Sequence, residues 1–312
     1  MRAASLAHAL APRARPSHAA PRQLGASAQK SFARGIARLA VGSLYTELCL
    51  YPKPGLVSLV DSGSHSDMNA ATFMRSLFSL RHYFKDICLA GLNDAPFAKL
   101  KQLGIAAEKA MLKATRGVNT HRGAIYSLGL LCAAAGRARA QGTPLTPAAL
   151  RATMLIRWGE ELAMHASAPS TPTAAASNGL RVAAQYAASG AREEGALGLP
   201  SVFEIGVPAL QTARARGATM TMARIDALFA LMAHISDSNV YHRAGPQGAQ
   251  TVTTHARSFL DAGGTANAKW FEQALASHRL FVQRRLSPGG AADLLAASCL
   301  VQSIAALDAE RR

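Results

Sequence analysis

Long stretches in which apolar residues recur at steps of three and four dominate this chain. In the clearest of them, Phe73, Leu77, Leu80, Phe84 and Ile87 follow one another at steps of four and three. This spacing places side chains on one face of an α-helix. Runs of β-branched residues, which favour strands, are almost absent. The sequence therefore predicts helices and no sheet.

The same pattern recurs along the chain, with short loops rich in Gly, Pro and Asn between the helical stretches. Hydrophobic residues make up 49% of the sequence and aromatic residues only 6%, so helix-forming Ala and Leu supply most of the core. We predict an all-α fold, a compact multi-helix bundle in a single domain over residues 29–312. The further predicted helices cover 31–50, 96–115, 122–141, 147–166, 174–190, 207–216, 220–236, 247–262, 266–286 and 289–309.

The charge balance is strongly basic, with a formal net charge of +16. Residues 1–40 carry seven of these positive charges and no acidic group, which leaves +9 on the rest. A basic body favours a polyanionic partner, such as a nucleotide, a nucleic acid or an acidic protein. By composition, residues 1–28 are a flexible basic tail. A signal or transit peptide has a similar look, although the apolar stretch here is short and interrupted by His8.

Cysteine usage points to a reducing compartment. The four cysteines are far apart in apolar helical contexts, so we expect buried free thiols and neither disulfides nor a zinc site. A cytoplasmic location fits this pattern. We expect no membrane span, because no apolar run appears long enough to cross a bilayer.

Polar segments interrupt the apolar pattern at six places. The first, residues 51–57, combines two prolines with Lys53 and Gly55, and is either part of a site or a surface turn. The second, residues 61–69, places Asp61, His65 and Asp67 within seven residues. These groups suit a divalent metal or acid–base chemistry, although Ser66 or Asp67 could simply cap the next helix.

The third segment, Gly117–Gly123, opens a predicted helix and is the most informative. Asn119 or Thr120 can cap that helix, while its free N–H groups and positive dipole end would attract a phosphate. The glycines at both ends let the backbone approach a ligand closely. The alternative is a capped helix start without a ligand.

Three more polar segments follow. In residues 190–200, Arg192 suits a phosphate and Glu194 a ribose hydroxyl or a metal-bound water, unless both form a salt-bridged helix end. In residues 237–245, Asp237 and Asn239 suit a hard cation, and Arg243 an anion. Residues 284–293 place Ser-Pro-Gly-Gly at a helix start, which is also a common plain N-terminal turn. Standard nucleotide loops, zinc spacings and hydrolase elbows are missing from the sequence.

Taken in order, these segments resemble the triphosphoribosyl-dephospho-coenzyme A synthase family from about residue 40 to the C-terminus. The resemblance rests on Pro52-Lys53-Pro54-Gly55-Leu56-Val57, Gly63-Ser64-His65 with Asp67-Met68, Gly117-Val118-Asn119-Thr120-His121 with Gly123-Ala124-Ile125, Ser127-Leu128-Gly129-Leu130-Leu131, Gly190-Ala191-Arg192 with Glu194, Asp237 with Asn239-Val240, and Ser287-Pro288-Gly289-Gly290 with Ala292-Asp293-Leu294-Leu295. The variant spanning residues 57–68 is similar to the malonate decarboxylase branch rather than the citrate lyase branch.

The resemblance implies an all-α enzyme that moves the triphosphoribosyl group of ATP onto the 2′-hydroxyl of 3′-dephospho-coenzyme A and releases adenine. The product would be the precursor of a prosthetic group on an acyl carrier subunit. The sequence departs from the family pattern at Asn69, where a second Asp is expected, and at Ala244, where Gly is usual. Ser238 and Arg122 replace a usual Thr and a frequent Lys.

When the N-glycosidic bond of ATP breaks, positive charge builds on the ribose, and nearby carboxylates can stabilise that charge. The attacking 2′-hydroxyl of the acceptor needs a base. The predicted catalytic residues are Asp67, His65, Asn119 and His121. The predicted substrate and phosphate contacts are Lys53, Gly117, Arg122, Gly123, Arg192, Glu194, Arg243, Ser287 and Gly289. The triphosphate implies Mg²⁺, with Asp61, Asp67, Asp237 and Asn239 as predicted ligands.

The sequence leaves several alternatives open for the catalytic base and for the class of function. Asp67, Asp237 or a motif histidine could serve as the base, and His65 and His121 could instead be hydrogen-bonded core histidines. A helical ATP-dependent phosphotransferase would share the ATP site but release ADP. A basic helical nucleic-acid-binding protein would need basic residues along one helix face with aromatic neighbours, whereas the arginines here are scattered. We therefore expect neither a nucleic-acid nor a membrane partner.

Overall fold

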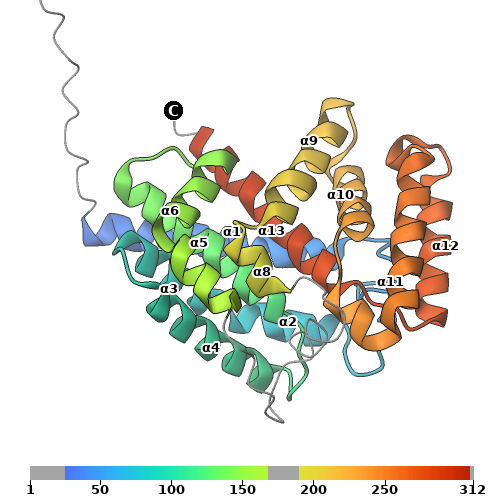
Figure 1. Cartoon of the computed structure of the whole chain (residues 1–312), viewed down its shortest axis with the longest axis horizontal. Coiled ribbons are helices and arrows are strands. Elements are labelled where there is room, and N and C mark those ends of the chain that lie inside the picture. The colour runs from blue at the N-terminus through green and yellow to red at the C-terminus, as the bar shows by residue number, and fades with distance from the viewer. Residues whose placement is uncertain (1–24, 168–189, 310–312) are drawn as a thin grey trace, which may run out of the picture.

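The computed structural model describes residues 25–167 and 190–309, and every regular element within them is a helix (Figure 1). The predicted all-α, single-domain architecture is confirmed. The helices are α1 (Ala26–Cys49), α2 (Ala70–Ser79), α3 (Arg81–Leu92), α4 (Phe97–Ala114), α5 (Arg122–Gln141), α6 (Pro147–Ser167), α8 (Ala191–Ala196), η1 (Ser201–Gly206), α9 (Val207–Ala215), α10 (Met220–His234), α11 (Ser238–Asp261), η2 (Gly264–Ala266), α12 (Trp270–Gln283) and α13 (Gly289–Ala309).

The predicted helix over 174–190 and most of the predicted basic tail lie outside the described residues. The helix α1 begins at Ala26, so the last three residues of the predicted tail, 26–28, are helical. The helices predicted at 122–141 and 289–309 have the predicted bounds. The short α8 and η1 were not predicted as helices, because neither is long enough to show an apolar repeat.

Helices α5 and α13 form the centre of the bundle (Figure 1). α5 packs against α3, α4, α6 and α13, and α13 packs against α1, α5 and α10. The contact between α3 and α5 is close enough that a Cβ added at Gly91 would lie 2.0 Å from the carbonyl oxygen of Ala133. A Cβ at Gly136 would lie 2.2 Å from the carbonyl oxygen of Cys88. The abundance of Ala and Gly therefore lets backbones touch and leaves little room for larger side chains.

The clearest apolar repeat of the sequence forms two helices rather than the single one we predicted. α2 ends at Ser79 and α3 starts at Arg81, with Leu80 between them in helical conformation (φ −87°, ψ −8°). The repeat continues through the bend because Leu80 keeps helical torsions. Packing decides the break: α2 lies on α4 and α1, whereas α3 lies on α5 and α1.

The helix α11 bends at Gly245 and Pro246. Gly245 has non-helical torsions (φ 61°, ψ −161°) and Pro246 follows it, so the helix consists of two segments joined at a kink. The predicted helix 247–262 is the segment after the kink. The segment before it belongs to the polar stretch 237–245 and carries Asn239 and Arg243.

Two sequence expectations were wrong: that all four cysteines are buried, and that no apolar run is long enough to cross a membrane. Cys88, Cys132 and Cys299 are buried free thiols, but Cys49 at the end of α1 is exposed. Within the described part of the chain, α13 is long and apolar enough by composition to cross a membrane, and 50% of its most apolar window is buried inside the fold. Its packing against α1, α5 and α10 is that of a central helix.

Candidate active site

Five of the six polar segments meet where helices α5, α11 and α13 begin. The loop between α1 and α2 lies against the turn before α13: the Ser64 hydroxyl donates to the carbonyl of Leu286 (2.5 Å). Asp237, at the start of α11, bonds to the first turn of α13. Asp293, which follows the first turn of α13, lies against the first turn of α5. Residues far apart in sequence thus form one polar region within an apolar bundle.

Asp237 holds the starts of α11 and α13 together. Its Oδ1 accepts a hydrogen bond from the Asn239 N–H (2.9 Å), and its Oδ2 accepts one from the Ala291 N–H (3.0 Å). A Cβ added at Gly290 would lie 3.0 Å from Oδ2, so glycine permits this approach. Burial raises the pKa of Asp237, and the backbone N–H bonds oppose that shift. Asp237 therefore acts as an N-cap, the alternative to its predicted role as a metal ligand.

The Asp293 carboxyl group lies at the start of α5, where we expected a phosphate to bind. It accepts a hydrogen bond from the Ala124 N–H, and a Cβ added at Gly123 would lie 2.3 Å from its Oδ2. Burial raises the pKa of Asp293 well above its ordinary value, and the negative charges of Glu47 and Asp237 raise it further. The N-terminus that we expected to attract a phosphate thus already holds a carboxyl group of the protein.

The side chain of Asn119 accepts a hydrogen bond from the first backbone N–H of α5. Its side-chain oxygen accepts a hydrogen bond from the Arg122 N–H (3.2 Å), and the Arg122 guanidinium forms a salt bridge with Glu108 (2.5 Å). Gly117 has φ +91°, a conformation that favours glycine. Asn119 is exposed whereas His121 is buried, so the structure separates two residues that we expected to face one site. Arg122, predicted to bind phosphate, is already paired with a carboxylate.

His121 is the N-cap residue of α5 and is only 2% exposed. Its Nδ1 lies 2.6 Å from the Ser76 hydroxyl of α2, and that hydroxyl lies 2.7 Å from the Thr120 hydroxyl. Its Nε2 is buried and has no hydrogen-bond partner in the described part of the chain. Burial lowers the pKa of His121 to about 3, and the positive charge of Lys53 contributes to the shift. His121 is therefore a neutral imidazole with one free nitrogen.

Lys53 and Glu47 form a buried ion pair. The Lys53 Nζ lies 2.5 Å from Glu47 Oε1, and the Lys53 side chain is 1% exposed. Burial lowers the pKa of Lys53 and raises the pKa of Glu47, while their mutual attraction opposes both shifts. Our sequence analysis missed Glu47. Its signal was an acidic residue three positions after Leu44 and one before Leu48, on the buried face of the first helix.

A second polar group lies at the surface around His65. Its Nε2 lies 2.8 Å from the Ser287 hydroxyl, and its Nδ1 lies 2.9 Å from an Arg243 nitrogen. Because arginine only donates, Nδ1 is an acceptor and the proton sits on Nε2. The Asp67 carboxylate, 56% exposed, lies 3.4 Å from Nδ1. Burial and then the charge of Arg243 lower the pKa of His65. Three other predicted site residues, Asp67, Arg243 and Ser287, therefore meet around a neutral histidine.

The three predicted carboxylate ligands of the metal form no common cluster among the described residues. Asp61 accepts a hydrogen bond from the Gly63 N–H (2.8 Å) and lies 3.2 Å from His278 Nε2. Asp67 lies beside His65, and Asp237 is the buried N-cap of α11. Across residues 25–167 and 190–309, no group of three or more His, Cys, Asp or Glu side chains could hold a metal ion.

The fourth polar segment forms α8, which packs against α6 and α5. Glu194 accepts hydrogen bonds from the Ser201 hydroxyl (2.5 Å) and the Ser201 N–H (3.2 Å). A Cβ added at Gly195 would lie 2.5 Å from the hydroxyl of Tyr126, which is one turn along α5 from Arg122. Glu194 thus stabilises the start of η1, and the charge of Arg192 lies near the Tyr126 hydroxyl.

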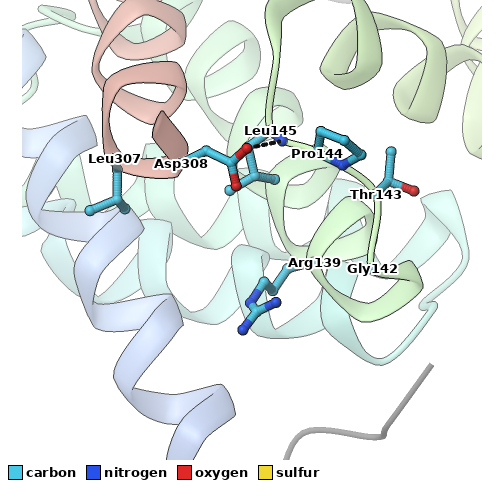
Figure 2. A pocket seen from close by; sticks show the side chains of 7 residues that line it. All are labelled: Arg139, Gly142, Thr143, Pro144, Leu145, Leu307 and Asp308. Carbon is cyan, nitrogen blue, oxygen red and sulfur yellow. Dashed lines mark hydrogen bonds between the residues drawn. The ribbon is translucent and has the colours of Figure 1, made fainter. Parts of the chain in front are cut away.

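A surface pocket lies elsewhere on the described part of the chain. A pocket of about 290 Å³ opens where α5 and α13 end, and its lining includes Arg139, Leu145 and Asp308 (Figure 2). Asp308 accepts a hydrogen bond from the Leu145 N–H (3.2 Å). α5 has 20 residues and is about 30 Å long, so this pocket is a helix length away from His121.

Comparison with known proteins identifies the family. The model of the family described as CitG: ATP:dephospho-CoA triphosphoribosyl transferase matches residues 33–312. The chain belongs to this family. It is therefore an enzyme, as the motifs of residues 52–293 predicted.

Curated relatives agree over most of the chain. A protein of Acinetobacter calcoaceticus named a probable 2-(5''-triphosphoribosyl)-3'-dephosphocoenzyme-A synthase is 39% identical over 257 residues, which cover 82% of this chain and 86% of the relative. A protein of Pseudomonas putida with the same name is 41% identical over 275 residues, covering 86% and 94%. No solved structure matches the chain.

Proposed function

We propose that this enzyme transfers the triphosphoribosyl group of ATP to the 2′-hydroxyl of 3′-dephospho-coenzyme A and releases adenine. The observation that carries the proposal is the convergence of the family motifs. Segments 51–69, 117–124, 237–243 and 287–293 supply buried ionisable groups to one region at the starts of α5, α11 and α13. The names of the family and of its curated relatives supply the substrate class.

The residues of this region suit the parts of the reaction. A carboxylate beside the ribose stabilises the positive charge that builds as the glycosidic bond breaks. Asp293, which was missing from our predicted site, is the carboxyl group we assign to this role, because it lies between the starts of α5 and α13. Its raised pKa favours the neutral form in the free enzyme, and the positive charge that builds on the ribose favours its ionised form. His121, a neutral imidazole with a free Nε2, is the group we assign as the base for the attacking hydroxyl.

Cationic groups for the phosphates come from the same region. Arg243 donates to His65 from the exposed surface, and His65 in turn bonds to Ser287 in the turn before α13. We infer that this surface group contacts the triphosphate. Lys53 lies deeper and is paired with Glu47, so we infer that it sets the electrostatic potential around His121 rather than contacting solvent-exposed phosphates.

Magnesium is expected with ATP, and the donor set fits a loosely held ion. Mg²⁺ in phosphate-transfer sites is usually bound by one or two carboxylates together with substrate phosphates and water. Asp67 is the exposed carboxylate beside Arg243 and His65, so it would hold the ion, which neutralises phosphate charge when bound. Asp61 and Asp237 are engaged in hydrogen bonds with the protein.

The finer assignment concerns the downstream pathway. The variant of residues 57–68 favours a role in making the prosthetic group of a malonate decarboxylase rather than a citrate lyase. The product would then be used on an acyl carrier subunit, and we place the reaction in the cytoplasm. Attachment of the product to each candidate carrier by its partner transferase, measured by mass spectrometry, distinguishes the two branches.

Adenine release tests the reaction itself. The full chain is incubated with ATP, Mg²⁺ and 3′-dephospho-coenzyme A, and the products are separated by chromatography. We expect free adenine only when both substrates are present. ADP as the sole nucleotide product would overturn the proposal in favour of a phosphotransferase. Binding of nucleic acid without adenine release would favour the nucleic-acid-binding alternative.

A further inference from the structure

Three hydrogen-bonding groups form a continuous chain from the interior of the site to the loop before α5. The Nδ1 of His121 lies 2.6 Å from the Ser76 hydroxyl, and the Ser76 hydroxyl lies 2.7 Å from the Thr120 hydroxyl. His121 and Ser76 are buried, whereas Thr120 is half-buried on the loop. The inner end of the chain is the Nε2 of His121, which has no partner among the described residues.

This chain can carry its protons in two arrangements. In one, Thr120 donates to Ser76 and Ser76 donates to Nδ1, so the imidazole proton sits on Nε2. In the other, Nδ1 donates to Ser76 and Ser76 donates to Thr120, so Nε2 is a free acceptor. A hydroxyl can donate one hydrogen bond while accepting another, and a neutral imidazole has one donor and one acceptor nitrogen. The two arrangements therefore differ only in proton positions.

A simple base at this position would be inefficient. Burial and the charge of Lys53 lower the pKa of His121 to about 3, so only about one ring in 10⁴ would hold an extra proton at pH 7. A base that passes its Nδ1 proton on while Nε2 receives one never becomes an imidazolium. The Ser76 hydroxyl lies where it can accept the Nδ1 proton, and the Thr120 hydroxyl lies where it can accept the proton that Ser76 passes on.

We propose that His121, Ser76 and Thr120 form a proton relay that removes the proton of the attacking hydroxyl of the acceptor substrate. The proposal rests on the proposed function. As the hydroxyl oxygen bonds to C1′ of the ribose, its proton moves to Nε2, the Nδ1 proton moves to Ser76, the Ser76 proton to Thr120 and the Thr120 proton to water. The C1′–N9 bond breaks, its electron pair stays on adenine, and adenine takes up one proton from water, so the protons balance.

The substrate hydroxyl must reach Nε2, which is closed to solvent. Phe73 of α2 contacts the imidazole edge-on, with ring centroids 5.0 Å apart and an angle of 75°. Phe73 is half-buried, whereas Ser76 one turn later is fully buried. Phe73 is therefore the side chain that we expect to turn aside when the acceptor binds.

Paired variants of Thr120 test the outer end of the relay. Thr120→Val keeps the shape of the side chain and removes the hydroxyl, whereas Thr120→Ser keeps the hydroxyl. We expect Thr120→Val to lower kcat at least tenfold with KM for both substrates within about twofold, and Thr120→Ser to retain kcat within about twofold. Equal kcat in the two variants would overturn the relay.

Ser76→Ala tests the middle of the relay, with Ser298→Ala as its matched control. Both serines are fully buried on helices, and the Ser298 hydroxyl donates to the Leu294 carbonyl within α13 and lies against Gly206 of η1. We expect kcat to fall about 10²-fold or more in Ser76→Ala, the range of a lost general base, and to change little in Ser298→Ala. The wild type should show a solvent isotope effect from several protons that falls to a single-proton effect in Ser76→Ala. Similar kcat values in the two variants would contradict the proposal.

Nitrogen NMR of the histidine rings tests the relay without turnover. We expect the His121 ring of the wild type to stay neutral down to about pH 4 and to exchange between both tautomers, and Ser76→Ala to fix one of them. A single tautomer that is unchanged by Ser76→Ala would overturn the relay, whatever the reaction. Failure of the wild type to release adenine would instead overturn the proposed function, so the two failures are distinguishable.

Discussion

Helices α5 and α13 touch at both ends, and the two ends differ in what their side chains do. At the starts, Asp293 accepts the Ala124 N–H across the interface, and Gly123 leaves room for it. At the ends, Asp308 accepts the Leu145 N–H at the rim of an open pocket (Figure 2). The first contact is buried among other ionisable groups, and the second borders solvent.

The surface pocket and the cluster of buried ionisable groups thus lie at opposite ends of these two helices. The pocket at the helix ends is lined by Arg139 and Asp308, beside a left-handed Gly142 that closes α5. Around the helix starts, Glu47, Lys53 and Asp237 are buried and Asp293 is half-buried, and all four have shifted pKa values. Burying charge is costly, so four such groups in one place indicate function rather than stability.

The largest effect should come from breaking the buried ion pair. Lys53→Met leaves Glu47 buried without its partner, and we expect the variant to lose about 3–5 kcal/mol of unfolding free energy. The double variant Lys53→Met with Glu47→Gln should regain part of that loss, because no unpaired charge remains. Urea denaturation measures both. If the unfolding free energy of Lys53→Met lies within about 1 kcal/mol of the wild type, Glu47 is not a buried charge that needs Lys53 as its partner.

Neutralising Asp293 should affect turnover. We expect Asp293→Asn to lower kcat about 10²–10³-fold, the cost of one lost electrostatic contact at a reacting centre. Asp308→Asn on the same helix is the control and should retain kcat within about twofold. Adenine release measures both variants. Equal kcat values would remove the functional difference between the two ends of α13.

Acid should destabilise the fold through His121. Its pKa falls to about 3 on folding from an unfolded value near 6.5, so its contribution is complete above pH 6.5 and declines as the pH falls towards 3. Relative to His121→Gln, the wild type should lose about 2–3 kcal/mol of unfolding free energy between pH 6.5 and 4.5.

Glu47, Asp237 and Asp293 have raised pKa values, and their contributions have the opposite sign, being present at low pH and lost as the pH rises. They are common to both proteins, so the difference between the wild type and His121→Gln isolates the histidine. Urea midpoints at each pH provide the measurement. Parallel pH profiles would mean that the imidazole is not held neutral.

The smallest effect should come from the pocket end. Asp308→Ala removes a carboxylate that accepts the Leu145 N–H in a partly exposed position, and we expect a loss of about 1 kcal/mol or less. Thermal unfolding and adenine release should both stay close to the wild type. A large loss of turnover would place this pocket in the reaction and reverse the comparison between the two ends.

The sequence alone predicted most of the helices, because apolar spacing and loop residues are local signals. α5 and α13 have the predicted bounds, and the segment of α11 after its kink lies where the helix 247–262 was predicted. The break at Leu80 was not predictable, since the apolar repeat continues through it and only the different partners of α2 and α3 bend the chain.

The candidate site likewise combines features that the sequence predicts with features that only packing between helices decides. The sequence by itself predicted which segments would carry chemistry, because polar residues between apolar helices need a reason, and it placed His65, Asp67, Arg243 and Ser287 among the candidates. Tertiary structure alone decided that these four meet, and that Asn119 faces solvent while His121 is buried. It also recruited Glu47 and Asp293, because burial, which sets the pKa of an acidic group, depends on neighbours from other helices.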